Sequence, residues 1–308
     1  MTGGDEAAAA PGGGAAPART GAPPPATRRA WPLRLWLGLG LLGLLTLAAV
    51  LGPALATAHG LEAEMPDLLE RFAPASAAHP LGRDELGRDV LARLLAGARV
   101  SLAVGLATAL VATALGTAVG VLAAWKGGWV EALLMRLADG LLALPALPLL
   151  VLLAAADTSV IGLPRGEATS DVIRIVAILA AFGWVGVARL ARAAALSVLA
   201  RDWVRAARAL GASEARVLAR HVLPSLAAPV SVAAALSAAG AILAESTLSF
   251  LGLGIQPPVP SWGNMLANAQ DLVLSAPWVA LWPGLAIVAA VAGFTLLADG
   301  VRRAGAGG

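Results

Sequence analysis

The chain has 308 residues, of which 58% are hydrophobic and only 13% are charged. Soluble domains carry about 25% charged residues, so this composition excludes an ordinary soluble domain and indicates a membrane protein. The absence of cysteine excludes disulfides, thiolate metal sites and cysteine nucleophiles. The net charge of +3 is small and the arginines flank apolar segments, so nucleic acid is not an expected partner.

The first part of the chain predicts a tail followed by a membrane span. Residues 1–30 are largely Ala, Gly and Pro with little to bury, which predicts a disordered cytosolic tail. Residues 31–96 then hold the first transmembrane helix and an external lead-in segment, because Leu35–Ala58 is free of charge and exceeds about 20 helical residues. A cleaved signal peptide is the alternative, but its apolar core is typically only about 7–15 residues.

Residues 97–303 are expected to form the transmembrane core, followed by a short cytosolic tail at 304–308. The same length rule places five further spans at Val100–Trp125, Leu133–Ala156, Val172–Ala194, Leu226–Phe250 and Trp278–Ala298. The predicted fold is therefore all-α, a polytopic membrane protein with six transmembrane helices. In the fourth span, Arg174 and Arg189 leave a short uncharged stretch that requires snorkelling at both ends, so a buried, non-spanning helix is its alternative.

Basic residues set the expected orientation of these spans. If both termini are cytoplasmic, 15 of the 22 basic residues lie inside and seven lie outside. Cytoplasmic loops carry the excess of Lys and Arg, so we expect both termini in the cytoplasm.

Small residues and prolines mark two places inside the spans. Gly116 and Gly120 lie four apart on one helical face and predict close packing of another helix. Pro145 and Pro148 predict a break in the third span. An ordinary kink and a kink that lines a cavity remain equal alternatives for the prolines, because freed backbone groups need protein or water as partners.

The sequence offers no catalytic or cofactor-binding constellation. His59, His79 and His221 are far apart and none has H-x-x-x-H spacing, so no metal site is expected. The single lysine, Lys126, does not follow a glycine-rich phosphate loop, so the chain supplies no Walker-type nucleotide site. We therefore expect a protein that is not an enzyme and binds no cofactor itself.

A carboxylate lies near the outer end of the fifth span. Glu245 has Ser246 and Ser249 as neighbours, and intramembrane carboxylates need partners. These three residues are candidates for lining a translocation pathway. An acid that is hydrogen-bonded at a helix interface is the alternative.

A basic segment, "DWVRAARALGASEARVLARHVLP", lies between the fourth and fifth spans on the predicted cytosolic side. A short helix from Asp202 to Leu210 is followed by Gly211 as a break, and Ser213 caps a second helix with Glu214 in its first turn. This pattern predicts a helix-hinge-helix loop. A surface amphipathic pair lying on anionic lipid is the alternative.

The residue order in this segment resembles the E-A-A, x3, G, x9, I, x, L-P loop of permease subunits in ATP-binding-cassette importers. Arg205 stands at the glutamate position and His221 at the isoleucine position. The resemblance implies an ATPase-coupling loop that contains Arg205, Ala206, Ala207, Leu210, Gly211, Ala212, Ser213, His221, Leu223 and Pro224.

Three further segments narrow the resemblance: "HPLGRDELGRDVLARLLAGARVSL", "ESTLSFLGLGIQPPVPSWGNML" and "SAPWVALWPGLAI". They resemble the C-type permease of the dipeptide, oligopeptide and nickel importers. The resemblance implies a multi-pass protein of a bacterial-type inner membrane, a B-type permease partner, two ATPase subunits that use ATP and Mg, and an external solute-binding protein. Short peptides are the expected substrate, and nickel complexes or glutathione-like solutes are alternatives within the same machinery. A stand-alone ion-coupled carrier or channel, or a lipid-binding scaffold, is the alternative from another class.

Overall fold

A computed structural model describes residues 33–156, 166–267, 272 and 275–306. All of the described residues belong to one compact unit, residues 31–308. The predicted tail at 1–30 lies outside the described residues. So do positions 307 and 308 of the predicted C-terminal tail, whereas residues 304–306 continue the last helix.

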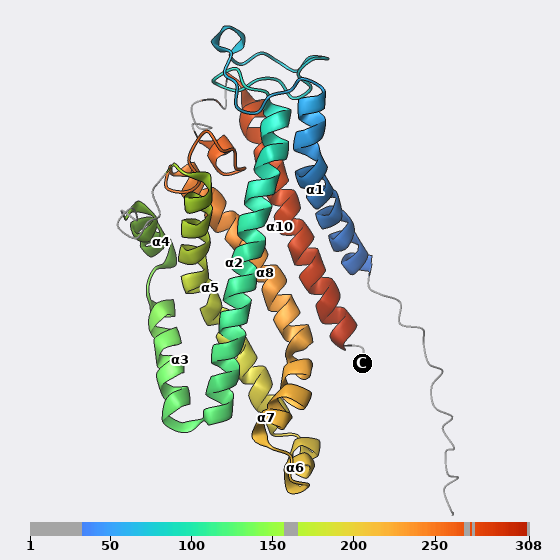
Figure 1. Ribbon diagram of the computed structural model, residues 1–308, viewed down its shortest axis with the longest axis vertical. Helices are drawn as coiled ribbons and strands as arrows, with labels where there is room; N and C mark the ends of the chain where they lie inside the picture. The colour runs from blue at the N-terminus through green and yellow to red at the C-terminus, as the bar shows by residue number, and fades with distance from the viewer. Residues whose placement is uncertain (1–32, 157–165, 268–271, 273–274, 307–308) are drawn as a thin grey trace, which may run out of the picture. The chain divides into compact units, whose positions relative to one another are not determined.

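The described residues form helices and contain no strand (Figure 1). The long helices are α1 (Leu33–Ala58), α2 (Val90–Lys126), α3 (Gly128–Ala143), α4 (Ala146–Ala155), α5 (Ala168–Leu199), α8 (Leu223–Phe250) and α10 (Pro277–Ala306). The short ones are η1 (Leu68–Glu70), α6 (Asp202–Ala209), α7 (Glu214–Val217), η3 (Leu218–Val222) and η4 (Asn264–Leu266).

Among the described residues, five helices are long and apolar enough to cross a membrane: α1, α2, α5, α10 and the continuous helix Glu214–Phe250 that includes α8. The pair α3 and α4 gives the sixth span if the two count together, although they are bent by 87°. The all-α, polytopic fold class is thus confirmed, with a broken third span. The fourth predicted span is part of α5, which passes the same test of length and composition.

The break in the third span falls where the prolines predict it. Helix α3 ends at Ala143, and Pro145 is the N-cap of α4. Pro148 lies in the first turn of α4, where a missing N–H costs no hydrogen bond inside the helix.

Small residues bring α2 and α5 into close contact (Figure 1). A Cβ added at Gly116 would lie 2.5 Å from the Trp184 carbonyl oxygen, and one at Gly120 would lie 2.3 Å from the Ala188 carbonyl oxygen. Only glycine fits at such distances. The predicted close helix packing at these two positions is confirmed. Helix α2 also packs on α8 and α1, and α10 packs on α1 and α8.

The lead-in between α1 and α2 is held against the start of α2 by ion pairs. Asp84 is buried and lies 2.8 Å from the Arg88 guanidinium and 3.3 Å from that of Arg93. Asp89 caps α2 by accepting from the Ala92 N–H at 2.7 Å, and it pairs with His79 at 2.9 Å. Ion pairs therefore join the lead-in to the start of α2.

Candidate functional site

The segment between α5 and α8, residues 202–224, is a compact structure rather than an extended loop. Helix α6 ends at Ala209, Leu210 is its C-cap, and the next residue, Gly211, has a φ of +86°. The Gly211 N–H donates to the Arg208 carbonyl oxygen at 2.9 Å, and the Ala212 N–H donates to the Ala207 carbonyl oxygen at 3.0 Å. These two bonds form a Schellman cap, in which the residue after the helix adopts a left-handed conformation that glycine favours. Gly211 is therefore a helix cap.

Side-chain contacts then fix α6 against α7 and η3. Arg208 pairs with Glu214 across the glycine at 2.9 Å. The ring of Trp203 lies 5.2 Å from that of His221. The Trp203–His221 contact therefore joins α6 to η3. The Arg208–Glu214 pair joins α6 to α7.

A buried apolar layer attaches this segment to the spans. Val204, Val217 and Val222 are fully buried, and they form one cluster with Ala195 of α5 and Leu226 of α8. Val204 therefore packs α6 against the ends of α5 and α8.

The opposite face of α6 is left open. Leu210 is 89% exposed, and Ala206 and Ala209 are exposed beside it. These three residues form a small apolar surface at the tip of the segment.

The structure places the other predicted loop residues in the same segment. Ser213 caps α7 and accepts from the Arg216 N–H at 3.4 Å, while Arg205 pairs with Asp202 on the exposed side of α6. Leu223 is half exposed and Pro224 lies in the first turn of α8. The helix that contains the fifth predicted span, Leu226–Phe250, begins earlier: it is continuous from Glu214 to Phe250 through the π-helical turn η3.

Glu245 forms a buried polar cluster where α8 meets α2. Its side chain is fully buried and accepts from Ser101 at 3.2 Å and from Ser249 at 2.7 Å. Both hydroxyls in turn accept backbone N–H groups, Ser101 from Trp262 at 3.1 Å and Ser249 from Ile255 at 3.0 Å. The carboxylate thus ties two helices to the segment that follows α8. Ser246 is buried beside it, and Gly263 passes so close that a Cβ there would lie 2.5 Å from the Ser246 Cα.

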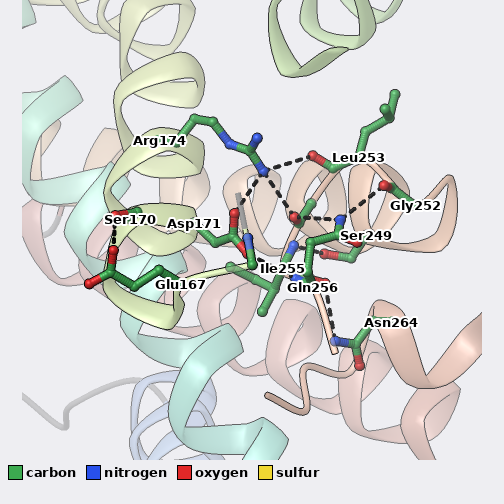
Figure 2. Close-up of polar contacts among 12 residues, drawn as sticks. Glu167, Ser170, Asp171, Arg174, Ser249, Gly252, Leu253, Ile255, Gln256 and Asn264 are labelled. Carbon is green, nitrogen blue, oxygen red and sulfur yellow. Dashed lines mark hydrogen bonds and ion pairs between the residues drawn. The ribbon is translucent and has the colours of Figure 1, made fainter. Parts of the chain in front are cut away.

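A second buried polar cluster, drawn in Figure 2, joins the start of α5 to the same segment. Arg174 donates to Asp171 at 3.0 Å and to the Gly254 carbonyl at 3.2 Å. The other Asp171 oxygen accepts from the Gln256 N–H at 3.2 Å. Both charged side chains are at most 2% exposed.

This cluster corrects the sequence interpretation of Arg174. We expected this arginine to snorkel toward the membrane surface, but its side chain is buried and paired inside the protein. The spacing of Asp171 and Arg174 could have indicated this ion pair, because residues three apart on one helix are neighbours. The backbone partners after α8 are distant in sequence and gave no such signal.

None of the described residues forms a group of three or more His, Cys, Asp or Glu side chains that could hold a metal ion. The described structure is that of a multi-pass helical membrane protein with one compact helical segment between two spans. Residues 116–304 match the family described as binding-protein-dependent transport system inner membrane component, and the chain belongs to this family. The family relationship inferred from the sequence motifs is thereby confirmed.

Curated relatives carry related descriptions. A di/tripeptide transport system permease protein DppC of Pseudomonas aeruginosa is 43% identical over 73% of this chain and 70% of its own length. A dipeptide transport system permease protein DppC of Alkalihalophilus pseudofirmus is 36% identical over 76% and 73% of the two chains. A glutathione transport system permease protein GsiD of Pectobacterium atrosepticum is 39% identical over 74% and 72%.

Proposed function

We propose that this chain is the C-type permease subunit of an ATP-driven importer of short peptides and forms half of its translocation pathway. The observation that carries the proposal is the compact α6–α7 segment, which is anchored to α5 and α8 by buried valines and exposes Leu210. The family membership and the peptide transport descriptions of its relatives support the same function.

The proposed partners follow from this role. A B-type permease subunit supplies the other half of the pathway, and an external solute-binding protein delivers the substrate. Two ATPase subunits bind ATP and Mg, so the purified chain alone should hydrolyse no ATP. The chain itself holds no cofactor and catalyses no reaction.

Coupling is proposed to run through the α6–α7 segment as a rigid element. A docked ATPase that moves on nucleotide binding displaces α6, and the Arg208–Glu214 pair joins α6 to the start of α7. The displacement therefore reaches α5 and α8 and shifts the balance between inward- and outward-facing states. The α6–α7 segment therefore moves as one rigid body and does not bend at Gly211.

The proposed location is the inner membrane, with both termini and the α6–α7 segment in the cytoplasm. The excess of basic residues on that side supports this orientation. Reporter fusions after Arg220 and Arg303 should report a cytoplasmic position, and fusions near Trp262 an external one. An external reporter after Arg220 would reverse the arrangement.

Glu245, Ser246 and Ser249 remain proposed pathway residues. In the conformation described, all three are buried between α8 and its neighbours. A pathway role therefore requires that the segment after α8 move away from α2 during the transport cycle. Without such a movement, the cluster acts as a helix interface.

Reconstitution tests the proposed function. Proteoliposomes that contain this chain with its B-type partner, both ATPase subunits and the solute-binding protein should accumulate a labelled dipeptide only when ATP is present. A panel of tripeptides, glutathione and a nickel complex ranks the substrates, with glutathione included because of one relative's description. Accumulation that is independent of ATP would support the carrier or channel alternative instead.

A further inference from the structure

A charged groove lies between α3 and α5 and shares no lining residue with the Glu245 and Arg174 clusters. It has a volume of about 590 Å³ and is lined by Gly128, Glu131, Ala132, Met135, Asp139, Arg189, Arg192 and Ala193. Two ion pairs cross it. Arg192 pairs with Glu131, and Arg189 lies 3.3 Å from Asp139.

The packing of α2 on α5 shows how far this groove lies from the ends of the helices. Gly120 of α2 abuts Arg192 of α5 and lies six residues before Lys126, the end of α2, which at 1.5 Å per residue is about 9 Å. Asp139 lies eleven residues along α3 from Gly128, which is about 16 Å. Asp139 also lies within the third predicted span, Leu133–Ala156, so we expect the Arg189–Asp139 pair at membrane depth.

The Arg189–Asp139 pair is nevertheless exposed on the surface of this chain. The side chains of Arg189 and Asp139 are 56% and 62% exposed. An arginine can snorkel toward the membrane surface, but the short side chain of an aspartate cannot. A carboxylate that faces acyl chains is strongly disfavoured, so this face does not contact lipid. A protein partner would also bury two charges, and charged residues are depleted from the cores of protein interfaces.

We propose that the α3–α5 groove lines the water-filled, cytosolic part of the translocation pathway and receives zwitterionic solutes. Two carboxylates can bind an ammonium group, and two guanidiniums can bind a carboxylate. The volume is that of a site for a small molecule. This inference rests on the proposed function, and it assigns the free ends of a short peptide to these four side chains.

The opposite face of α3 provides an internal control. Leu137 lies two residues before Asp139 at nearly the same depth, points about 200° away around the helix, and is 56% exposed. An apolar side chain at this depth suits contact with lipid. A difference between the two positions therefore reports the environment of each face rather than the depth.

Cysteine labelling tests the assignment, because the natural chain contains no cysteine. Single variants Asp139→Cys and Leu137→Cys are prepared in the complete transporter in inside-out vesicles and treated with a membrane-impermeant trimethylammonium methanethiosulfonate. A thiol reacts as its thiolate, which forms in water and not in lipid. Asp139→Cys should react at least tenfold faster. Equal or slower labelling of Asp139→Cys would mean that lipid or the partner subunit covers the groove, and would overturn the proposal.

A second arm tests the chemical class of the solute. Met135→Cys places a thiol in the groove without altering its four charges. Alanyl-alanine should slow its labelling at least threefold, and the same dipeptide with acetyl and amide caps should not. Equal slowing by both, or none by either, would reject a zwitterion site. Labelling needs no transport, so failure here with intact ATP-driven uptake would leave the proposed function standing.

Discussion

The polar side chains at the two ends of helix α5 behave in opposite ways. Near its start, Asp171 and Arg174 are almost fully buried and satisfied by the chain itself. Near its other end, Arg189 and Arg192 line an open groove, and the α6–α7 segment that follows exposes Leu210. Enclosed polar groups hold the helices together, whereas open ones are available to water, solute or a partner. Substitutions at the two ends should therefore differ in what they damage.

The largest expected effect is on stability, at the enclosed end. Arg174→Ala leaves Asp171 as a buried, unpaired charge, which should cost about 3–5 kcal/mol of unfolding free energy. The matched variant Arg189→Ala removes a half-exposed partner and should cost about 1 kcal/mol or less. Thermal unfolding of both variants in detergent measures the difference. Similar losses of unfolding free energy in the two variants would contradict the difference between the two ends of α5.

Close packing of α2 and α5 gives the next effect. Gly120→Val forces atoms into the Ala188 backbone, and overpacking of this kind should cost about 3 kcal/mol. Gly186→Val carries the same change in helix propensity, but its Cβ meets nothing within 4 Å. Unfolding midpoints should fall for the first variant and stay near the parent value for the second. Equal midpoints would mean that the helices move apart at little cost.

At the open end, transport rather than stability should respond. Gly211→Pro removes the N–H that caps α6 and cannot adopt the φ of +86°, so α6 is misplaced at a cost of about 1–3 kcal/mol. Peptide uptake should drop at least tenfold while the membrane spans remain folded. Gly211→Asn is the control, because asparagine tolerates the left-handed conformation. Parent-level uptake by the proline variant would show that the cap does not matter for coupling.

The smallest effect is expected at Glu245. Glu245→Gln keeps the shape of the side chain but exchanges one acceptor for a donor, which should cost about 1 kcal/mol at its serine contacts. If the cluster opens during transport, uptake kinetics should change while assembly with the partner subunits is preserved. Kinetics equal to those of the parent would remove the pathway role and leave a helix interface.

Local sequence patterns predicted the helices well and the long-range polar contacts poorly. Apolar runs placed the spans, and Gly116 and Gly120 predicted close packing of another helix, because both signals lie within one helix. The structure shows that this neighbour is α5. The bend of 87° between α3 and α4 depends on packing beyond the prolines that cause the break. Asp171 meets Gln256 across 85 residues, and no local pattern encodes that contact.

The α6–α7 segment shows the same division. The positions of Gly211 and Ser213 predicted a break and a cap, and both are present. The Trp203–His221 contact and the valines buried against α5 were not predicted, because they depend on how the segment folds back. These contacts make the segment compact on both sides of Gly211.

The central claim is that α6 transmits force from a separate ATPase, and Ala207→Glu tests it most directly. A carboxylate at this half-buried position should disrupt a packed contact, whereas Ala207→Ser keeps the side chain small. The measurement is co-purification of the ATPase subunits together with ATP-driven dipeptide uptake. The account predicts that Ala207→Glu inserts and folds normally but loses the ATPase and nearly all uptake, while Ala207→Ser retains both. A complex of Ala207→Glu that assembles and transports at the parent rate would contradict it.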